Sequence, residues 1–149
     1  MTNSYRVHFF HLVWSTKNRK KYLQPKIQET LYPYMGGIIR KSEGSLIEIG
    51  GMPDHVHLLV EISNLDRHAS LIRNTKASST AWLKKEFREC TDFAWQDGYG
   101  SFAVSTSLID NVRDYIRNQE RHHATQSYES EFLKLLELNK VSFDPRYVF

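Results

Sequence analysis

Two histidines separated by a single valine constrain the fold of this chain more than any other feature. His55 and His57 lie in the run GGMPDHVHLLV, which starts at Gly50 and has the pattern of a β-strand. Because successive side chains of a strand point to opposite faces of its sheet, both imidazoles must leave the same face. The opposite face receives the apolar side chains of Val56, Leu58, Val60 and Ile62. The run therefore predicts a sheet with one face in the core and the other available for chemistry.

The length and composition of the chain predict one globular domain over residues 1–149. Of its 149 residues, 40% are hydrophobic and 25% are charged, which is ordinary for a soluble protein that buries a single core. No apolar run approaches the roughly 18 residues that cross a bilayer, and the opening MTNSYR lacks the apolar segment of a signal peptide. The single cysteine, Cys90, cannot form an internal disulfide. We therefore expect a cytoplasmic protein with no membrane partner.

Strand and helix patterns alternate along the chain. Runs rich in β-branched and aromatic residues predict four strands, over residues 5–15, 46–51, 55–62 and a stretch through Phe102 and Val104. Apolar residues at helical spacing predict helices over residues 25–41, 65–89, 108–123 (capped by Ser107) and 129–138. The order β-α-β-β-α-β is that of a ferredoxin-like split βαβ unit, in which two helices cover one face of an antiparallel sheet. We therefore predict an α+β ferredoxin-like fold whose second face, carrying the two histidines, is open to a ligand.

The paired imidazoles are candidate metal ligands, although a His-x-His pair alone is more often structural. On the predicted helix over residues 108–123, Tyr115 and Gln119 place a phenol and an amide one turn apart on one flank. Two imidazoles and an amide oxygen form an open set that fits Mg²⁺ or Mn²⁺ better than zinc, which would need a third imidazole, a thiolate or a carboxylate. A tyrosine beside such an ion can attack a phosphodiester. The alternative is that Tyr115 is a half-buried packing residue and Gln119 a surface residue.

Basic residues are clustered, although the net charge of +3 does not by itself establish a nucleic-acid partner. One cluster follows the first predicted strand, and another lies near the end of the second predicted helix. The last cluster forms a stripe with i, i+4, i+8 spacing on the third predicted helix. A solvated surface is the alternative for each cluster, but three clusters around one site favour phosphate binding. The residues assigned to phosphate contacts are Lys17, Arg19, Lys20, Arg113 and Arg117.

Four segments, in this order along the chain, resemble the single-tyrosine HUH transposases of small bacterial insertion sequences. They are HLVWSTKNR from His11, MPDHVHLLV, FAWQDGYGSFAVS and YIRNQERHH from Tyr115. The family is that of the IS200-like transposases, and its relatives include the REP-associated tyrosine transposases. The resemblance extends from about residue 5 to the C-terminal FDPRYVF.

The resemblance implies a role for each candidate residue. His55 and His57 would be the paired metal ligands and Gln119 the third protein ligand. Tyr115 would be the nucleophile that forms a 5′-phosphotyrosine link to single-stranded DNA, which is cleaved and later rejoined. The segment with Lys76 and Ser79 resembles a family helix and is expected to face DNA or the site, with solvent exposure as the alternative.

The resemblance also implies partners. Members of the family are homodimers whose sheets join, and in well-studied members the tyrosine of one subunit completes the histidine site of the other. Their substrates are single-stranded DNA with hairpins at the ends of the element. Trp14 or Tyr99 could stack on unpaired bases, with core packing as the alternative.

Two other functions are compatible with the same residues. A domesticated or non-catalytic nucleic-acid-binding protein would keep the fold without the chemistry. A metal-dependent hydrolase would use the histidines with water as the nucleophile, and so would form no covalent intermediate.

Overall fold

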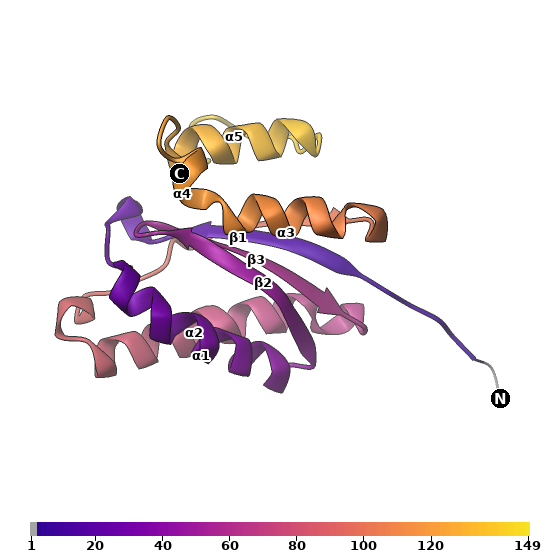
Figure 1. Ribbon diagram of the computed structural model, residues 1–149, viewed down its shortest axis with the longest axis horizontal. Coiled ribbons are helices and arrows are strands. Elements are labelled where there is room, and N and C mark those ends of the chain that lie inside the picture. Colours follow the sequence, from indigo (N-terminus) through magenta and orange to yellow (C-terminus); the bar gives the residue numbers. More distant parts are fainter. Residues whose placement is uncertain (1–2) are drawn as a thin grey trace.

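A four-stranded antiparallel sheet lies at the centre of the molecule, between two layers of helices (Figure 1). The structure is a computed structural model that describes residues 3–149. Its strands follow the order β2-β3-β1-β4. Their bounds are β1 Phe9–Ser15, β2 Gly44–Met52, β3 His55–Ile62 and β4 Gly100–Val104. This strand order and the α+β composition confirm the predicted ferredoxin-like fold.

Five α-helices and four short 3₁₀ helices complete the described chain. The α-helices are α1 Pro25–Lys41, α2 His68–Glu86, α3 Ile109–Arg117, α4 Gln119–His122 and α5 Tyr128–Leu138. The 3₁₀ helices are η1 Lys17–Arg19, η2 Leu65–Arg67, η3 Arg88–Cys90 and η4 Thr106–Leu108. Between residues 3 and 149 there is no helix both long enough and apolar enough to cross a membrane.

Several predicted boundaries agree with the structure and others do not. The helix over residues 25–41 and the strand over residues 55–62 have the bounds of α1 and β3. The helix predicted over residues 108–123 is divided at Asn118 into α3 and α4. Ser107 does not cap it, because this serine lies inside η4, and α3 instead starts after Leu108 without a side-chain cap. The Ser107 hydroxyl bonds to that of Ser105 instead.

The apolar side of β3 forms the main core, as predicted. Its side chains pack against α1 and α2, which cover that face of the sheet (Figure 1). On α1 the buried residues recur every four positions and form one stripe toward the sheet. The fully buried side chains of β3 in this core are Val56, Leu58, Val60 and Ile62.

The second face of the sheet is not open, contrary to the expectation, because α3, α4 and α5 cover it (Figure 1). His55 and His57 are fully buried beneath this layer. The physical reason is that α3 and α5 carry apolar stripes of their own, which need an apolar surface to cover. A smaller core results, in which Phe132 and Leu136 of α5 pack against Val13 of β1.

A glycine of β2 permits this covering layer to lie close to the sheet. A Cβ atom at Gly50 would lie 2.4 Å from the carbonyl oxygen of Ile116 on α3. Gly50 is also paired with His57 across the β2–β3 ladder. The helix that carries Tyr115 therefore packs directly on the strand beside the histidines.

Candidate metal and nucleophile site

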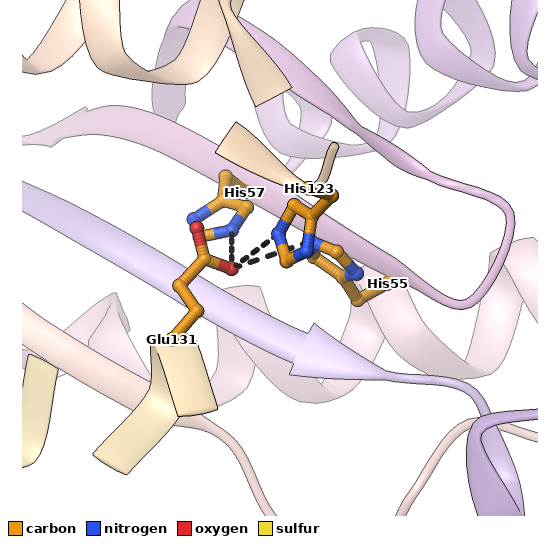
Figure 2. Close-up of side chains that lie close together, drawn as sticks. All are labelled: His55, His57, His123 and Glu131. Atoms are coloured by element: carbon orange, nitrogen blue, oxygen red, sulfur yellow. Dashed lines mark hydrogen bonds and ion pairs between the residues drawn. The ribbon is translucent and has the colours of Figure 1, made fainter. Parts of the chain in front are cut away.

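The two histidines of β3 meet two further side chains from the covering layer. His55 and His57 point from the sheet toward His123, which follows α4, and toward Glu131 of α5 (Figure 2). One ligand atom from each of the four residues lies within 4.8 Å of the others. Three imidazoles and a carboxylate thus form a cluster with the composition of a metal site.

One carboxylate oxygen is the centre of this cluster. Oε1 of Glu131 lies 2.9 Å from Nε2 of His57, 3.0 Å from Nε2 of His123 and 3.4 Å from Nε2 of His55. The Nε2 atoms of all three rings therefore face one small region. Imidazole nitrogens that converge in this way form a site able to hold a divalent cation.

The other nitrogen of each ring is held from behind. Nδ1 of His55 lies 2.7 Å from Oδ1 of Asp54, and Nδ1 of His123 donates to the carbonyl oxygen of Gln126 at 2.6 Å. Nδ1 of His57 lies 2.8 Å from Nε2 of His11. Metal-binding histidines are usually oriented by a hydrogen bond to the ring nitrogen that does not bind the metal. The partners of these Nδ1 atoms therefore also fit a metal site.

Charge in the cluster is arranged by burial and hydrogen bonds. Burial lowers the pKa of His55, but hydrogen bonds to the carboxylates of Asp54 and Glu131 outweigh burial and raise that pKa to about 9. Burial also disfavours the charged form of Glu131, yet its bonds to the histidines hold its pKa well below the usual range. Burial and His57 lower the pKa of His11 to about 3. Glu131 is therefore ionised at neutral pH, and His11 is neutral.

Tyr115 and Gln119 reach the same carboxylate from α3 and α4. The Tyr115 hydroxyl donates to Oε2 of Glu131, and Nε2 of Gln119 donates to the same oxygen at 3.1 Å. Oε1 of Gln119 lies 2.9 Å from Nε2 of His55. The break at Asn118 does not separate the phenol from the amide. All four residues selected from the sequence as catalytic or metal-binding therefore lie together in one chain.

Three further residues of the site were not selected from the sequence. His11 had a usable signal, because Leu12 and Trp14 of β1 belong to the main core and alternation places His11 on the histidine face. His123 follows Gln119 by four residues and is the last residue of the helix predicted over residues 108–123, which by itself does not indicate a metal site. Glu131 carried no local signal, because only the packing of α5 brings it to β3.

His123 and Glu131 bear on the choice between zinc and Mg²⁺ or Mn²⁺. Zinc was disfavoured there because a third imidazole or a carboxylate was absent, and the structure supplies both in His123 and Glu131. The absence of ligands therefore no longer separates Mg²⁺ or Mn²⁺ from zinc.

Comparison with known proteins identifies the family. The sequence pattern of the family described as "Transposase IS200 like" matches residues 4–119. The chain belongs to the IS200-like transposase family. The matched region contains His55, His57, Tyr115 and Gln119, whereas His123 and Glu131 lie beyond it.

Individual relatives agree with this family. The ISDra2 transposase TnpA of Deinococcus radiodurans is 23% identical over 115 residues, which are 74% of this chain and 82% of that protein. A Deinococcus radiodurans R1 protein described as a transposase has a similar fold, with a TM-score of 0.62 and 23% identity over 80% of this chain and 96% of its own. A REP-associated tyrosine transposase solved with a REP hairpin gives a TM-score of 0.60 and 18% identity over 83% of this chain and 74% of its own.

In this transposase, the arginines assigned to phosphate contacts already have acidic partners. Nε of Arg19 lies 2.6 Å from Oε1 of Glu129. Arg113 and Arg117 share Oε1 of Glu48, at 3.4 Å and 2.9 Å. A phosphate would therefore compete with these carboxylates. Lys17 and Lys20, in contrast, are exposed after β1.

Two residues of α2 serve the structure of the transposase. Nζ of Lys76 donates to the carbonyl oxygens of residues 96, 97 and 98 at 2.7 to 3.2 Å, and so ties α2 to the loop before β4. Ser79 is fully buried, donates to the carbonyl oxygen of Thr75 and accepts from Nε1 of Trp95 at 2.9 Å. In this arrangement Ser79 faces the core, so its assignment to DNA contact stays a prediction that its position does not favour.

Of the two aromatic residues considered for base stacking, only Tyr99 is accessible. Trp14 is fully buried in the main core, so the core-packing alternative holds for it. Tyr99 is 42% exposed and lies near the end of Lys76. Of Trp14 and Tyr99, only Tyr99 could therefore stack on an unpaired base.

Proposed function

We propose that this transposase cleaves and rejoins single-stranded DNA through a 5′-phosphotyrosine on Tyr115. The observation that carries the proposal is the position of the Tyr115 hydroxyl. It is hydrogen-bonded to Glu131, whose other oxygen faces the three imidazoles. A nucleophile and a cluster able to hold a cation therefore meet in a single chain. This is the arrangement that attack on a charged phosphate requires.

In the proposed cleavage step, one bond to phosphorus forms and another breaks. The Tyr115 oxygen attacks phosphorus, and the bond from phosphorus to the 3′ oxygen breaks, with its electron pair leaving on that oxygen. The phenol loses its proton and the released 3′ oxygen gains one, so the step is balanced. Attack by a 3′-hydroxyl on the phosphotyrosine reverses the step and rejoins the strand. Glu131 holds the Tyr115 hydroxyl by a hydrogen bond, and Gln119 donates to the same carboxylate oxygen.

A divalent cation is expected at His55, His57, His123 and Glu131, with the Gln119 oxygen as a further donor. When bound, the ion supplies positive charge that polarises the scissile phosphate. Burial and the negative charge of Glu131 raise the pKa of Tyr115, so positive charge beside Glu131 also makes loss of the phenolic proton easier.

Mn²⁺ fits this donor set better than Mg²⁺. Imidazole nitrogens are ordinary ligands for transition metals, whereas Mg²⁺ prefers oxygen ligands and keeps several waters. Zinc is usually satisfied by four protein ligands, which three histidines and a carboxylate already provide, and would then leave no position for phosphate. We therefore propose Mn²⁺ as the ion that supports the reaction.

Single-stranded DNA with hairpins at the ends of an insertion sequence is the proposed substrate. A related REP-associated transposase has been solved with a REP hairpin, which supports a folded single strand as the partner. Lys17 and Lys20 offer exposed charges after β1, and Tyr99 offers an exposed ring. For such a substrate we propose that the protein acts in the cytoplasm.

A homodimer whose sheets join is proposed as the assembly, with each chain a single domain. The edge strand β2 is nine residues long and pairs only with β3 within residues 3–149. An unpaired edge of this length can add a strand from a second copy. In the present arrangement, however, Tyr115 reaches the histidines of its own chain.

Covalent trapping tests the proposal. Hairpin-bearing single-stranded DNA incubated with the protein and Mn²⁺ should give an adduct that survives denaturation, and Tyr115→Phe should give none. Tyr128→Phe is the matched control, because the Tyr128 ring lies 4.8 Å from that of His55 and is the neighbouring alternative nucleophile. Cleavage without an adduct would instead support a water-using hydrolase. DNA binding with neither adduct nor cleavage would support a non-catalytic binder.

A further inference from the structure

A cleft between α3 and α5 leads from solvent to the proposed nucleophile. Its volume is about 420 Å³, and its lining includes Tyr115, Glu131 and His11 of the site. Volumes of this size lie toward the small end of ligand pockets in proteins. A DNA strand whose phosphate reaches Tyr115 must therefore place the adjoining nucleotide in or beside this cleft.

The walls of the cleft are apolar. Leu108 and Val112 line it from the side of α3, and Leu135 and Leu138 line it from α5. Leu108 is 50% exposed and Leu138 is 78% exposed, so aliphatic surface faces solvent next to the site. Aliphatic walls do not solvate a phosphate, but they suit the flat apolar face of an unpaired nucleobase.

The polar groups of the cleft suit the edge of a base. The side-chain amides of Asn111 and Gln126 lie in its lining, and neither amide makes a hydrogen bond within residues 3–149, since Gln126 accepts from His123 through its backbone oxygen. An amide offers both a donor and an acceptor, which is why Asn and Gln pair with base edges. Lys134 lines the same cleft and adds a positive charge for the backbone of the strand.

We propose that this cleft holds the unpaired base next to the phosphate that Tyr115 attacks. The inference rests on the proposed function and adds to it a protein contribution to the choice of cleavage position. The occupant is a base of the substrate strand, because Tyr115 and the Glu131 to which its hydroxyl donates both line the cleft. Base-paired DNA would not supply it, because a paired base is stacked and its edge is occupied.

Abasic substitution tests the proposal in the reaction. Removing the base on one of the two sides of the scissile phosphate should slow adduct formation about tenfold, as expected when a base loses its apolar contacts with the cleft walls. The double variant Leu108→Ala/Leu138→Ala should slow the reaction of intact DNA by a similar factor. When abasic DNA is given to the double variant, the rate of adduct formation should be little lower than with either change alone, because both changes remove the same contact.

Leu65→Ala is the matched control for the cleft variant. Leu65 is also 50% exposed, but it lies in η2 beside α2, in the other helical layer. This variant should retain the full abasic penalty and the full rate on intact DNA. Additive penalties in the cleft variant, or no abasic penalty on either side, would overturn the inference while leaving the adduct and the proposed function intact. Absence of any adduct would overturn both.

A second measurement does not depend on activity. A photoreactive base placed next to the scissile phosphate should cross-link to the cleft when bound to Tyr115→Phe, and mass spectrometry should locate the link within residues 108–112 or 134–138. Cross-links confined to other segments would contradict the inference. A cleft variant that dissociates a dimer, measured by sedimentation, would show that a second copy occupies the cleft, which also overturns it.

Discussion

The phenolic hydroxyl of Tyr115 donates a hydrogen bond to Oε2 of Glu131. The other oxygen of that carboxylate lies 2.9 to 3.4 Å from the Nε2 atoms of three histidines. A single side chain of α5 therefore joins the proposed nucleophile to the proposed metal ligands. Because α5 lies beyond the region matched by the family, that region alone does not contain this connection.

Replacing Glu131 tests its place in the metal site. Glu131→Gln removes a negative charge from among the imidazoles, and we expect Mn²⁺ affinity to fall at least tenfold. Isothermal titration calorimetry would measure the change. Glu129→Gln is the control, because Glu129 lies on the same helix and pairs with Arg19 rather than with the histidines. Unchanged affinity in Glu131→Gln would show that Glu131 is not a ligand.

The identity of the ion is open to direct measurement. At equal concentrations, Mn²⁺ should support more adduct than Mg²⁺, because three imidazoles suit Mn²⁺ better. Zinc should bind more tightly than either and support less adduct, because four protein ligands would complete its coordination. Rates of adduct formation with each ion check the order. Equal rates with Mg²⁺ and Mn²⁺ would contradict the argument from the donor set.

The stability of the protein in a chelator should fall as pH rises from 6.5 to 9. The pKa of His55 is raised from 6.5 to about 9 in the folded chain, so its stabilising contribution is complete below 6.5 and is lost as pH rises through 9. The full effect is about 3 kcal/mol. The pKa values of His11 and His57 are lowered, so neither changes charge in the folded chain within this window. Denaturant unfolding across the window measures the slope.

Asp54 supplies the control for this pH dependence. Its carboxylate bonds to Nδ1 of His55, so Asp54→Asn should weaken the shift and flatten the slope. A slope that is the same in both proteins would assign the pH dependence to another group.

Gly50→Ala should displace the helix that carries Tyr115. The new Cβ would lie 2.4 Å from the carbonyl oxygen of Ile116, so β2 and α3 must separate, at a cost of about 1 to 3 kcal/mol. Adduct formation should fall together with stability, because Ile116 is adjacent to the nucleophile. The control is Gly37→Ala on α1, where a Cβ would meet nothing within 4 Å and should stabilise the helix slightly. Urea unfolding and adduct yield measure the two effects.

Ser79→Ala should reduce stability without weakening DNA binding. The Ser79 hydroxyl accepts the indole hydrogen of Trp95 inside the core, and its loss leaves that donor unpaired, at about 1 to 3 kcal/mol. Ser78→Ala on the same helix controls for helix propensity, because Ser78 is only half-buried. Thermal unfolding and a DNA-binding assay separate the two roles. A selective loss of DNA affinity in Ser79→Ala would restore the original assignment.

Local patterns in the sequence were sufficient for much of the fold and half of the site. Alternation of side chains in residues 55–62 placed both imidazoles on one face and the core on the other. Helical spacing placed Tyr115 and Gln119 on one flank, where they still meet despite the break at Asn118. These features depend on periodicities of two and about 3.6 residues, which any short stretch of sequence displays.

Only the tertiary structure decided what covers the histidine face. The apolar stripes of α3 and α5 show that each helix must be buried, but a stripe does not specify the surface that buries it. The packing of α5 on the sheet brought Glu131 to His57, which is 74 residues away in the chain. It also buried a site that was expected to be open. Local sequence therefore determined the direction of each side chain within its own element, and long-range packing determined which side chains meet.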